Sequence, residues 1–549
     1  MKQIITKILS KEVGLKKEEI ENLIEVPHSP ELGDYAFPCF VLAGRFKKNP
    51  GEIAFEIKNK IKKLPKEIDE IKVSGAYINF FVNKKILSEN VIKDILSKKE
   101  DFGKQNIGKG KKILIEHTSI NPNASPHVGR ARNAIIGDSI VKIFEFLKFK
   151  PEVHYYVNDV SKQIAILVFA KAENLKFEKM LEVYSKTAKK VMDSKEAEEK
   201  IFEILKKFEE GDKNIVKSFK RITDIAIQGQ KKILSELGIH YDFFDYESRY
   251  MKSTKKILSD LEKTKKIFTD ENGRKVLDLK GTSVEGKMKS PVLVLTRKDG
   301  TGLYPLRDIV YTIEKIKKSK ENLIVLGEDQ RLYFLQISEA LKLLGYPSPK
   351  VVHYSFVLLT EKGISKKMST RKGEVVLLEE FLKDAEKKAM EKSKNKSASK
   401  KISVAAVKYA ILKNNPEKLI NFNLEDSLNF EGDTGPYLLY SYVRANSILK
   451  KIKKNKKESK INDLEMKETE LVKKFSQFPE IVLNSYKNFN PSVIANYSYQ
   501  LCQTFNEFYH ECPVIGSERE FFRKKLVESF KIVLGNCLKL LGIKTIKEM

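Results

Sequence analysis

Residues 113 to 138 combine side chains and backbone features that can bind a phosphate group. The short apolar run 113–115 predicts a buried parallel strand, and the Ser-, Asn- and Pro-rich stretch 118–126 predicts a loop after it. Apolar residues then keep a helical period from Ala134 to Phe144. Unpaired backbone N–H groups and the dipole at the start of such a helix favour an anion. Four residues stand there as candidate contacts: His127, Gly129, Arg130 and Arg132.

His127 and Gly129 form an H-x-G pair in this predicted site. Gly129 has no side chain where a ligand would approach the backbone, and His127 can donate a hydrogen bond to a phosphoryl oxygen. A single histidine in a loop is equally often a structural hydrogen-bonding residue. The pair by itself therefore leaves both interpretations open.

A second candidate for phosphate binding is the basic run 365–373, which follows an apolar stretch that predicts a strand. The run supplies Lys, Arg, Ser and Thr donors and ends in glycine, so it can fold over a triphosphate. Lysine-rich surface loops are common, however, and are usually only solvated. The candidate residues in the run are Lys367, Met368, Ser369 and Arg371.

Tyr304 and Asp308 are four residues apart where a helix is expected to begin, so they would share one face of it. A carboxylate can form a bidentate pair with a guanidinium group, and an aromatic ring can stack on that group. An aspartate at a helix start is more usually a cap. Other polar side chains near the ends of predicted strands are Asn158, Asp159, Gln163, Gln330 and Gln336.

Two segments resemble the signatures of class I aminoacyl-tRNA synthetases. The segment S-I-N-P-N-A-S-P-H-V-G at 119–129, followed by R-N-A-I-I-G-D at 132–138, is similar to the HIGH region of arginyl-tRNA synthetases. The segment K-M-S-T-R-K-G at 367–373 is similar to the KMSKS region in the form that this family carries. Arg130 departs from the pattern, because it stands where the first signature has its second histidine.

The resemblance implies that the chain activates L-arginine with ATP and Mg²⁺ and transfers it to the 2′-OH of the terminal adenosine of tRNA(Arg). Family members commonly need bound tRNA before they activate arginine. The implied catalytic donors are His127, Lys367 and Arg371. The implied ATP contacts are His127, Gly129, Arg130, Met368 and Ser369, and the implied arginine contacts are Glu116, Ser119, Asn121, Tyr304, Asp308 and Gln330.

Two alternatives to this enzyme remain open at the level of sequence. The first is a catalytically silent tRNA-binding paralogue, which the change at Arg130 would permit. The second is a class I synthetase for another amino acid, against which the pair Tyr304 and Asp308 argues, because it suits a cationic side chain.

Contacts with tRNA are expected at both ends of the chain. The segments G-D-Y-A-F and I-N-F-F resemble the N-terminal domain of arginyl-tRNA synthetases, which would place Asn79 and Phe81 against RNA. Aromatic residues in the last third resemble those of a DALR-type anticodon-binding domain, although an aromatic stripe at helical spacing is more often core. The candidates there are Tyr437, Tyr440, Arg444, Tyr509 and Met549.

The composition limits the class of protein. The 549 residues carry 103 basic and 74 acidic side chains, a net charge of +29, which suits a polyanionic partner but also fits lysines spread over solvated helices. The four cysteines lack zinc-binding spacing, so no protein-bound metal is expected. Without an apolar membrane-spanning run or a signal peptide, we expect a cytoplasmic protein that does not bind membranes, and we expect a monomer.

These observations predict an α/β protein with a Rossmann-type class I catalytic domain, a small N-terminal α/β domain and a C-terminal all-helical domain. The expected boundaries are 1–105, 106–375 with a helical insertion at about 170–285, a linker or stem at 376–400, and 401–549. The apolar run 291–296 is expected to begin the second half of the catalytic sheet.

Overall fold

The computed structural model describes residues 1–361, 364–367, 377–393, 395–452 and 463–548. The chain forms two compact units, each of which gathers separate stretches of sequence. The first unit contains Met1–Lys99, Ile448–Ser476 and Thr504–Ile532, and the second contains Glu100–Ser447, Gln477–Gln503 and Val533–Met549. Among the described residues, no helix has both the length and the apolar character needed to cross a membrane.

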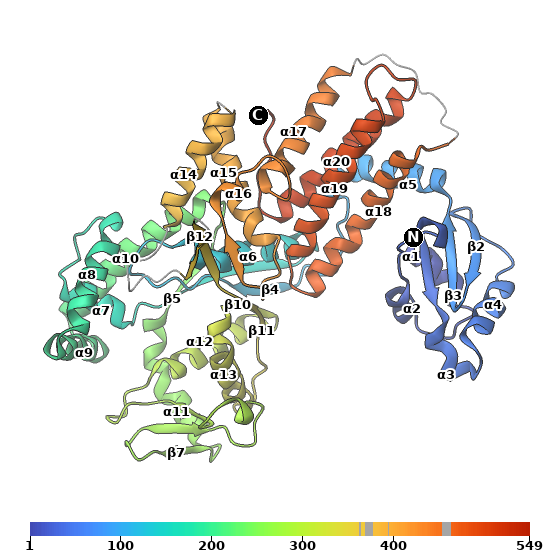
Figure 1. Ribbon diagram of the computed structural model, residues 1–549. Helices are drawn as coiled ribbons and strands as arrows, with labels where there is room; N and C mark the ends of the chain where they lie inside the picture. The colour runs from blue at the N-terminus through green and yellow to red at the C-terminus, as the bar shows by residue number, and fades with distance from the viewer. Residues whose placement is uncertain (362–363, 368–376, 394, 453–462, 549) are drawn as a thin grey trace. The chain divides into compact units, whose positions relative to one another are not determined.

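The N-terminal part of the first unit is a three-stranded antiparallel sheet with helices around it (Figure 1). In the middle strand, Ile78 and Phe80 are fully buried and fill the core between the sheet and the helices. The sheet order is β1-β3-β2, with strands β1 (Tyr35–Pro38), β2 (Ile68–Ser74) and β3 (Tyr77–Val82). The helices are α1 (Lys2–Leu9), α2 (Lys17–Leu23), α3 (Ala43–Phe46), α4 (Pro50–Lys60) and α5 (Lys84–Lys98).

The second unit is built around a five-stranded parallel sheet of order β11-β10-β4-β5-β6. Its strands are β4 (Lys112–Glu116), β5 (Lys150–Val157), β6 (Phe243–Tyr246), β10 (Asn322–Gly327) and β11 (Lys350–Tyr354). The chain leaves β4 toward β5 on one side and returns to β10 on the other, so the strand order reverses at β4. Ligands of such sheets bind in the crevice at this point, outside the carboxyl ends of the strands.

Three helices connect the strands at this crevice: α6 (Val128–Phe146), α12 (Tyr304–Lys318) and α13 (Arg331–Leu343). Helix α6 packs against β4, β5 and β10, and almost its whole length is buried (Figure 1). The apolar faces of α12 and α13 share one core, in which Leu306, Ile309 and Ile337 take part. The predicted order of strand, loop and helix around residue 127 is therefore confirmed.

The insertion after β5 is largely helical and has a core of its own. Its helices are α7 (Lys162–Phe169), α8 (Met180–Met192), α9 (Lys195–Glu210) and α10 (Lys213–Glu236). Leu167, Ile201 and Phe219 meet in this core, which explains the helical spacing of the apolar residues. After α10 the chain returns to the parallel sheet through β6 and continues into α11 (Thr254–Glu262).

The prediction for the apolar run 291–296 is wrong. Its strand β9 (Val292–Val294) pairs antiparallel with β8 (Lys275–Asp278), which in turn pairs with β7 (Ile267–Thr269). These strands form a separate small sheet whose Leu277 and Leu293 pack on the core of α12 and α13. A short apolar run shows that a strand is buried but does not show which sheet buries it.

A third sheet follows the parallel one, with the order β13-β12-β14. Its strands are β12 (Val357–Glu361), β13 (Ile364–Lys367) and β14 (Ile420–Phe422). Helices α14 (Leu378–Ser393) and α15 (Lys396–Leu412) lie between β13 and β14 in sequence and cover most of the stretch predicted as linker or stem, and α16 (Leu424–Ser427) follows β14. The described residues after α16 are mainly helical and form α17 (Gly435–Lys451), α18 (Met466–Lys487), α19 (Ser492–Glu511) and α20 (Glu520–Leu540).

Candidate active site

The first end of the crevice, which is the predicted phosphate site, lies at the N-terminus of α6, where His127 is the N-cap residue. Its Nδ1 accepts a hydrogen bond from the backbone N–H of Arg130 at 3.2 Å. Burial, together with the nearby charge of Arg130, lowers the pKa of His127 to about 3, so the ring is neutral at physiological pH. A neutral ring that accepts at Nδ1 carries its proton on Nε2, and that atom remains as a donor for a ligand. The structural and the ligand-binding interpretations of His127 are therefore compatible.

Gly129 and Arg130 occupy the first turn of α6 and are both partly exposed. The guanidinium of Arg130 forms no hydrogen bond or ion pair with any described residue. A cation without a partner, placed at a helix N-terminus, adds positive charge where an anion is already favoured. Arg130 thus remains available to a phosphate group.

The expectation that Arg132 contacts the same anion is wrong. Its side chain is fully buried, and its guanidinium donates hydrogen bonds to backbone carbonyl groups of two distant segments. Residues two apart on a helix point in different directions, so Arg130 and Arg132 cannot serve one ligand.

The other end of the crevice is centred on Asp308, in the second turn of α12. One carboxylate oxygen accepts a hydrogen bond from the Tyr156 hydroxyl at 3.0 Å, and the other accepts one from the Tyr333 hydroxyl at 2.5 Å. The ring of Tyr304, which is half exposed, lies 5.2 Å from the ring of Tyr333. Burial outweighs the two hydrogen bonds and raises the pKa of the Asp308 carboxyl above its usual range. Asp308 therefore lies among three tyrosines in the second turn of α12 and does not cap the helix.

Glu116, at the end of β4, forms a buried ion pair with Lys315 of α12. The Lys315 ammonium also lies 4.2 Å from the centre of the Tyr311 ring, whose hydroxyl donates to Asp245 at 2.9 Å. A substrate ammonium at Glu116 would share this carboxylate with Lys315. The role predicted for Glu116 stays a prediction, and the structure adds a cationic neighbour to it.

The loop after β4 is held by residues from outside the motif. Gln230 of α10 is fully buried and donates to the backbone carbonyls of Asn121 and Ala124 at 3.0 and 2.9 Å. The Tyr155 hydroxyl donates to Gln230 Oε1 at 2.7 Å. Asn121 is partly buried, whereas Ser119 is exposed. The insertion thus supports the loop that carries two of the predicted arginine contacts.

The remaining polar candidates separate into exposed and structural ones. Gln330 is exposed at the start of α13, while Gln336 is buried and donates to the Val292 carbonyl at 3.3 Å. Asp159 accepts hydrogen bonds from the backbone and side chain of Ser248 at 2.8 and 2.6 Å, a structural role. Asn158 Oδ1 and Gln163 Oε1 are buried without a partner in the described part of the chain.

Four of the predicted residues lie outside the described residues: Met368, Ser369, Arg371 and Met549. Lys367 is the last residue of β13, and its predicted donor role is untested. The proposed tRNA contacts differ in exposure. Asn79 is buried at 4% exposure, and Phe81 is partly exposed with the Lys72 ammonium 4.8 Å from its ring centre.

In the helical part, Tyr440 is exposed and the Arg444 guanidinium lies 4.8 Å from its ring centre. Tyr437 is partly buried, with its ring 5.6 Å from that of Tyr499. Tyr509 is also exposed and belongs to the first compact unit. Exposure of two of these rings is compatible with stacking on bases.

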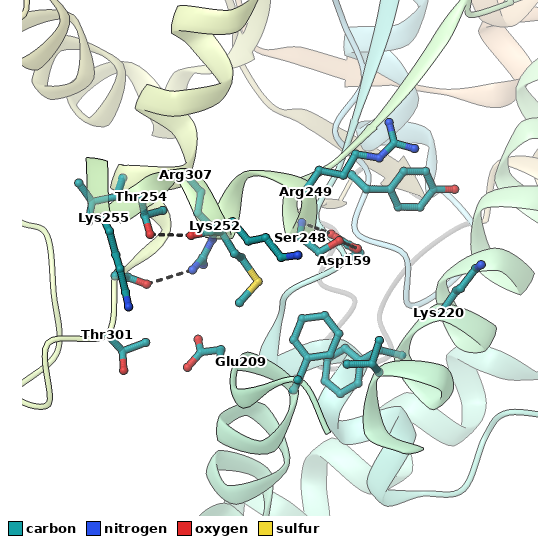
Figure 2. A pocket seen from close by; sticks show the side chains of 18 of the residues that line it. Asp159, Glu209, Lys220, Ser248, Arg249, Lys252, Thr254, Lys255, Thr301 and Arg307 are labelled. Atoms are coloured by element: carbon teal, nitrogen blue, oxygen red, sulfur yellow. Dashed lines mark hydrogen bonds between the residues drawn. The ribbon is translucent and has the colours of Figure 1, made fainter. Parts of the chain in front are cut away.

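A cavity of about 950 Å³ is lined by residues of α10 and α11, the loop 299–302 and residues 246–252 (Figure 2). Figure 2 shows Asp159 beside Ser248, with Arg307 on another wall. Asp308, Tyr304 and His127 do not line it. Acidic and basic side chains are mixed in its lining, so its charge does not indicate one class of ligand.

Sequence reasoning missed the residues that hold the candidate site in place, notably Gln230, Tyr333 and Lys315. Gln230 lies in an insertion where no chemical motif was found, and Tyr333 lies three residues after Gln330 on the same helix face. This spacing could have indicated that Tyr333 lies beside Gln330 in the candidate site. A lysine in a lysine-rich helix gives no such signal, because its burial depends on the partner at Glu116.

Three family models match the chain. The model for "tRNA synthetases class I (R), catalytic domain" matches residues 91–423, that for "DALR anticodon binding domain" matches 438–549, and that for "Arginyl tRNA synthetase N terminal domain" matches 1–82. The first covers more than half of the chain and contains the parallel sheet and both signature segments.

Curated relatives and solved structures agree over the full length. The chain is 36% identical to the arginine–tRNA ligase of Methanocaldococcus jannaschii, over 99% of this chain and 97% of that protein. It is 33% identical to the arginine–tRNA ligase of Clostridium perfringens over the whole of both chains. The Thermus thermophilus arginyl-tRNA synthetase structure superposes with a TM-score of 0.82 at 26% identity, covering 100% of this chain and 99% of that one.

Together, these matches and the fold confirm the predicted three-part organisation and the predicted class of enzyme. The matched segments run in the order expected from the two signatures, from the N-terminal domain to the anticodon-binding domain. The chain belongs to the arginyl-tRNA synthetases, the arginine–tRNA ligases of class I.

Proposed function

We propose that this arginine–tRNA ligase binds L-arginine at Asp308, activates it with ATP at the N-terminus of α6, and transfers it to tRNA(Arg). The observation that carries the proposal is the setting of Asp308. Each carboxylate oxygen already accepts a hydrogen bond from one tyrosine hydroxyl and can accept one more. Two free acceptor positions on one carboxylate are what a bidentate guanidinium requires. The exposed ring of Tyr304 offers a face on which that planar cation stacks.

The first step joins the arginine carboxylate to the α-phosphorus of ATP and releases pyrophosphate. Negative charge on the phosphoryl oxygens then needs fixed donors more than it needs a base. His127 supplies Nε2–H, Arg130 supplies an unpaired guanidinium, and Gly129 leaves the helix N-terminus open to the phosphates.

The basic run after β13 supplies the other donors in this proposal: Lys367 and Arg371 for the transition state, with Met368 and Ser369 as ATP contacts. Mg²⁺ is proposed to enter with the phosphates of ATP. Within the described ranges, no group of three or more His, Cys, Asp or Glu side chains is placed to hold a metal ion. The ATP oxygens would therefore be the main ligands of Mg²⁺.

The arginine substrate is positioned from both of its ends in this proposal. Gln330 approaches its side chain, and Glu116, Ser119 and Asn121 surround its ammonium and carboxylate. The second step moves the arginyl group from the adenylate to the 2′-OH of the terminal adenosine, and AMP leaves with the phosphate. Proximity and orientation of the two substrates supply most of the rate enhancement.

Binding of tRNA is proposed at Phe81 and Asn79 in the N-terminal domain, and at Tyr437, Tyr440, Arg444, Tyr509 and Met549 in the anticodon-binding domain. The burial of Asn79 favours Phe81 as the more direct contact. We also propose that the enzyme acts as a monomer in the cytoplasm, with domain limits at 105, 375 and 400. Sedimentation velocity would test the monomer, and limited proteolysis would test the limits.

The decisive experiment is aminoacylation of total tRNA with each of the twenty amino acids, in the presence of ATP and Mg²⁺. We expect charging with arginine alone, and loss of it in Asp308→Ala. Charging with another amino acid would contradict the role of Asp308. Retained tRNA binding without any charging would instead support a silent tRNA-binding protein, and reversion of Arg130 to histidine would then show whether that substitution is the cause.

A further inference from the structure

Arg132 is a fully buried cation that forms no ion pair with a carboxylate of the described residues. It lies in the second turn of α6, five residues after the N-cap His127, and its side chain has 0% exposure. Its two terminal nitrogens donate to five backbone carbonyl oxygens, at distances between 2.6 and 3.2 Å. Nη1 bonds to Ser355 and Phe356, and Nη2 bonds to Asn415, Pro416 and Lys418.

Burial of this charge costs desolvation free energy, which the hydrogen bonds to the carbonyl groups have to offset. Among the described residues, none of the acidic side chains forms an ion pair with Arg132. Burial lowers the pKa of the guanidinium to about 10, yet the group remains charged at neutral pH. Five carbonyl dipoles therefore replace both water and a counter-ion. A shorter side chain could not reach both segments, and an uncharged one could not replace the guanidinium donors.

The two segments are the starts of two paired strands. Residues 355–356 lead into β12, and residues 415–418 lead into β14, with Val357 opposite Ile420 in parallel register. The segments also bond to each other, because Ser355 N–H donates to the Pro416 carbonyl and Ile420 N–H donates to the Phe356 carbonyl. The guanidinium of Arg132 therefore sits where these two segments and α6 meet.

The same sheet leads to the second signature segment. Strand β12 pairs antiparallel with β13, with Leu358 opposite Lys367, and β13 ends at Lys367. The N-terminus of α6 carries His127 and Arg130, so Arg132 connects the elements that carry both groups of proposed ATP donors. The connection runs through the Arg132 guanidinium and the backbone carbonyl groups of 355–356 and 415–418.

We propose that Arg132 is a positioning residue for ATP, which fixes the N-terminus of α6 relative to the sheet β13-β12-β14. The proposal rests on the proposed function, because it assumes that His127 and Lys367 act on one nucleotide. A merely structural Arg132 would support folding without any preference between ATP and arginine as ligands. The positioning role instead predicts a selective loss on the ATP side.

The test compares Arg132→Lys, Arg132→Gln and Arg132→Met in steady-state aminoacylation, with ATP and arginine varied separately. Lysine keeps the charge but cannot reach five carbonyls, glutamine keeps a planar donor without charge, and methionine keeps only the volume. We expect KM for ATP to rise about tenfold or more in Arg132→Met, with partial rescue in Arg132→Lys. KM for arginine and tRNA affinity should stay within about twofold.

Arg523→Met serves as the matched control, because Arg523 is also buried but pairs with Glu468 and Glu465 in the first compact unit. It should lower the melting temperature without raising KM for ATP. Parallel changes in KM for ATP and arginine at Arg132, no change in either, or failure of all three variants to fold would overturn the proposal. Failure of the wild type to charge arginine would instead overturn the proposed function.

Discussion

Asp308 and His127 both stand near the start of a helix at the same crevice, but their surroundings differ. Asp308 accepts hydrogen bonds from two tyrosines that come from β5 and α13, so three elements fix its position. His127 bonds only to the backbone of its own helix among the described residues, and Arg130 beside it has no side-chain partner there.

The difference corresponds to the ligand that we propose for each end, the guanidinium of arginine at Asp308 and the triphosphate of ATP at His127. A guanidinium is a rigid planar cation, and a preorganised carboxylate discriminates it from other side chains at low entropic cost. A triphosphate is flexible and strongly charged, so a helix N-terminus and nearby cationic side chains can bind it without a fully formed ring of ligands. We infer that selectivity resides at the arginine end, while the nucleotide end contributes mainly to the rate.

Replacement of Asp308 by alanine should have the largest effect. It removes the carboxylate that faces the guanidinium and leaves that cation unpaired, a loss of roughly 2–5 kcal/mol for a buried charge pair. We expect kcat/KM for arginine to fall about a thousandfold, measured as initial rates of aminoacylation. Binding of tRNA, measured by filter retention, should stay nearly unchanged.

Asp299→Ala is the control for the Asp308 variant, since Asp299 is exposed and, among the described residues, forms its hydrogen bonds with Thr301 of its own loop. It should leave arginine kinetics as they are. If Asp308→Ala lost tRNA binding and arginine turnover equally, the comparison between a selective end and a catalytic end would fail.

At the nucleotide end, His127→Ala should reduce kcat about a hundredfold, the usual loss when one preorganised donor is removed. His127→Asn separates the two tasks of this residue. Asparagine is a good N-cap and can replace Nδ1 as acceptor, but it does not reproduce the donor at Nε2. Relative to His127→Ala, we expect His127→Asn to restore the thermal stability but not kcat. Full recovery of the rate would reduce His127 to a helix cap.

The sequence predicted the groups that a contiguous motif carries, and it could not predict their partners. His127, Gly129 and Arg130 follow one strand directly, and Tyr304 with Asp308 share a helical spacing, so local periodicity places them. Side-chain partners such as Gln230 come from more than 100 residues away, and only tertiary packing decides them. Arg132 shows the same limit, because a charged residue beside the motif proved to be buried.

Tyr333→Phe should have a smaller effect at the arginine end. It removes one of the two hydroxyl donors to Asp308, while Tyr156 still holds the other oxygen. A hydrogen bond to a charged group contributes roughly 1.5–3 kcal/mol, and water can replace part of it. We expect about a tenfold rise in KM for arginine with KM for ATP unchanged.

Tyr311→Phe is the matched control for Tyr333, because its hydroxyl donates to Asp245 and not to Asp308, while phenylalanine keeps the ring that stacks on Tyr156. It should lower the melting temperature and leave KM for arginine unchanged. An equal rise in KM for arginine in both variants would mean that loss of packing, and not the bond to Asp308, weakens arginine binding.

The smallest expected effect is that of pH on kcat/KM. It also separates the two ends of the crevice most directly. The pKa of Asp308 is raised by burial, so in the free enzyme this carboxyl takes up a proton at a higher pH than an ordinary aspartate. Its protonated form lacks the charge that attracts the guanidinium. We therefore expect kcat/KM for arginine to decrease as the pH falls, beginning above the usual range of aspartate titration.

The titration of His127, in contrast, should not affect the kinetics in this pH range. Its pKa is lowered to about 3, so the ring stays neutral from pH 8 down to pH 5, and Nε2–H remains a donor throughout. Because no proton is gained over this range, kcat/KM for ATP should have no acid limb from His127, and the profiles of the wild type and His127→Asn should be parallel. An acid limb near pH 6 that His127→Asn abolishes would show a charged imidazole, and the two ends would then both depend on titrating groups.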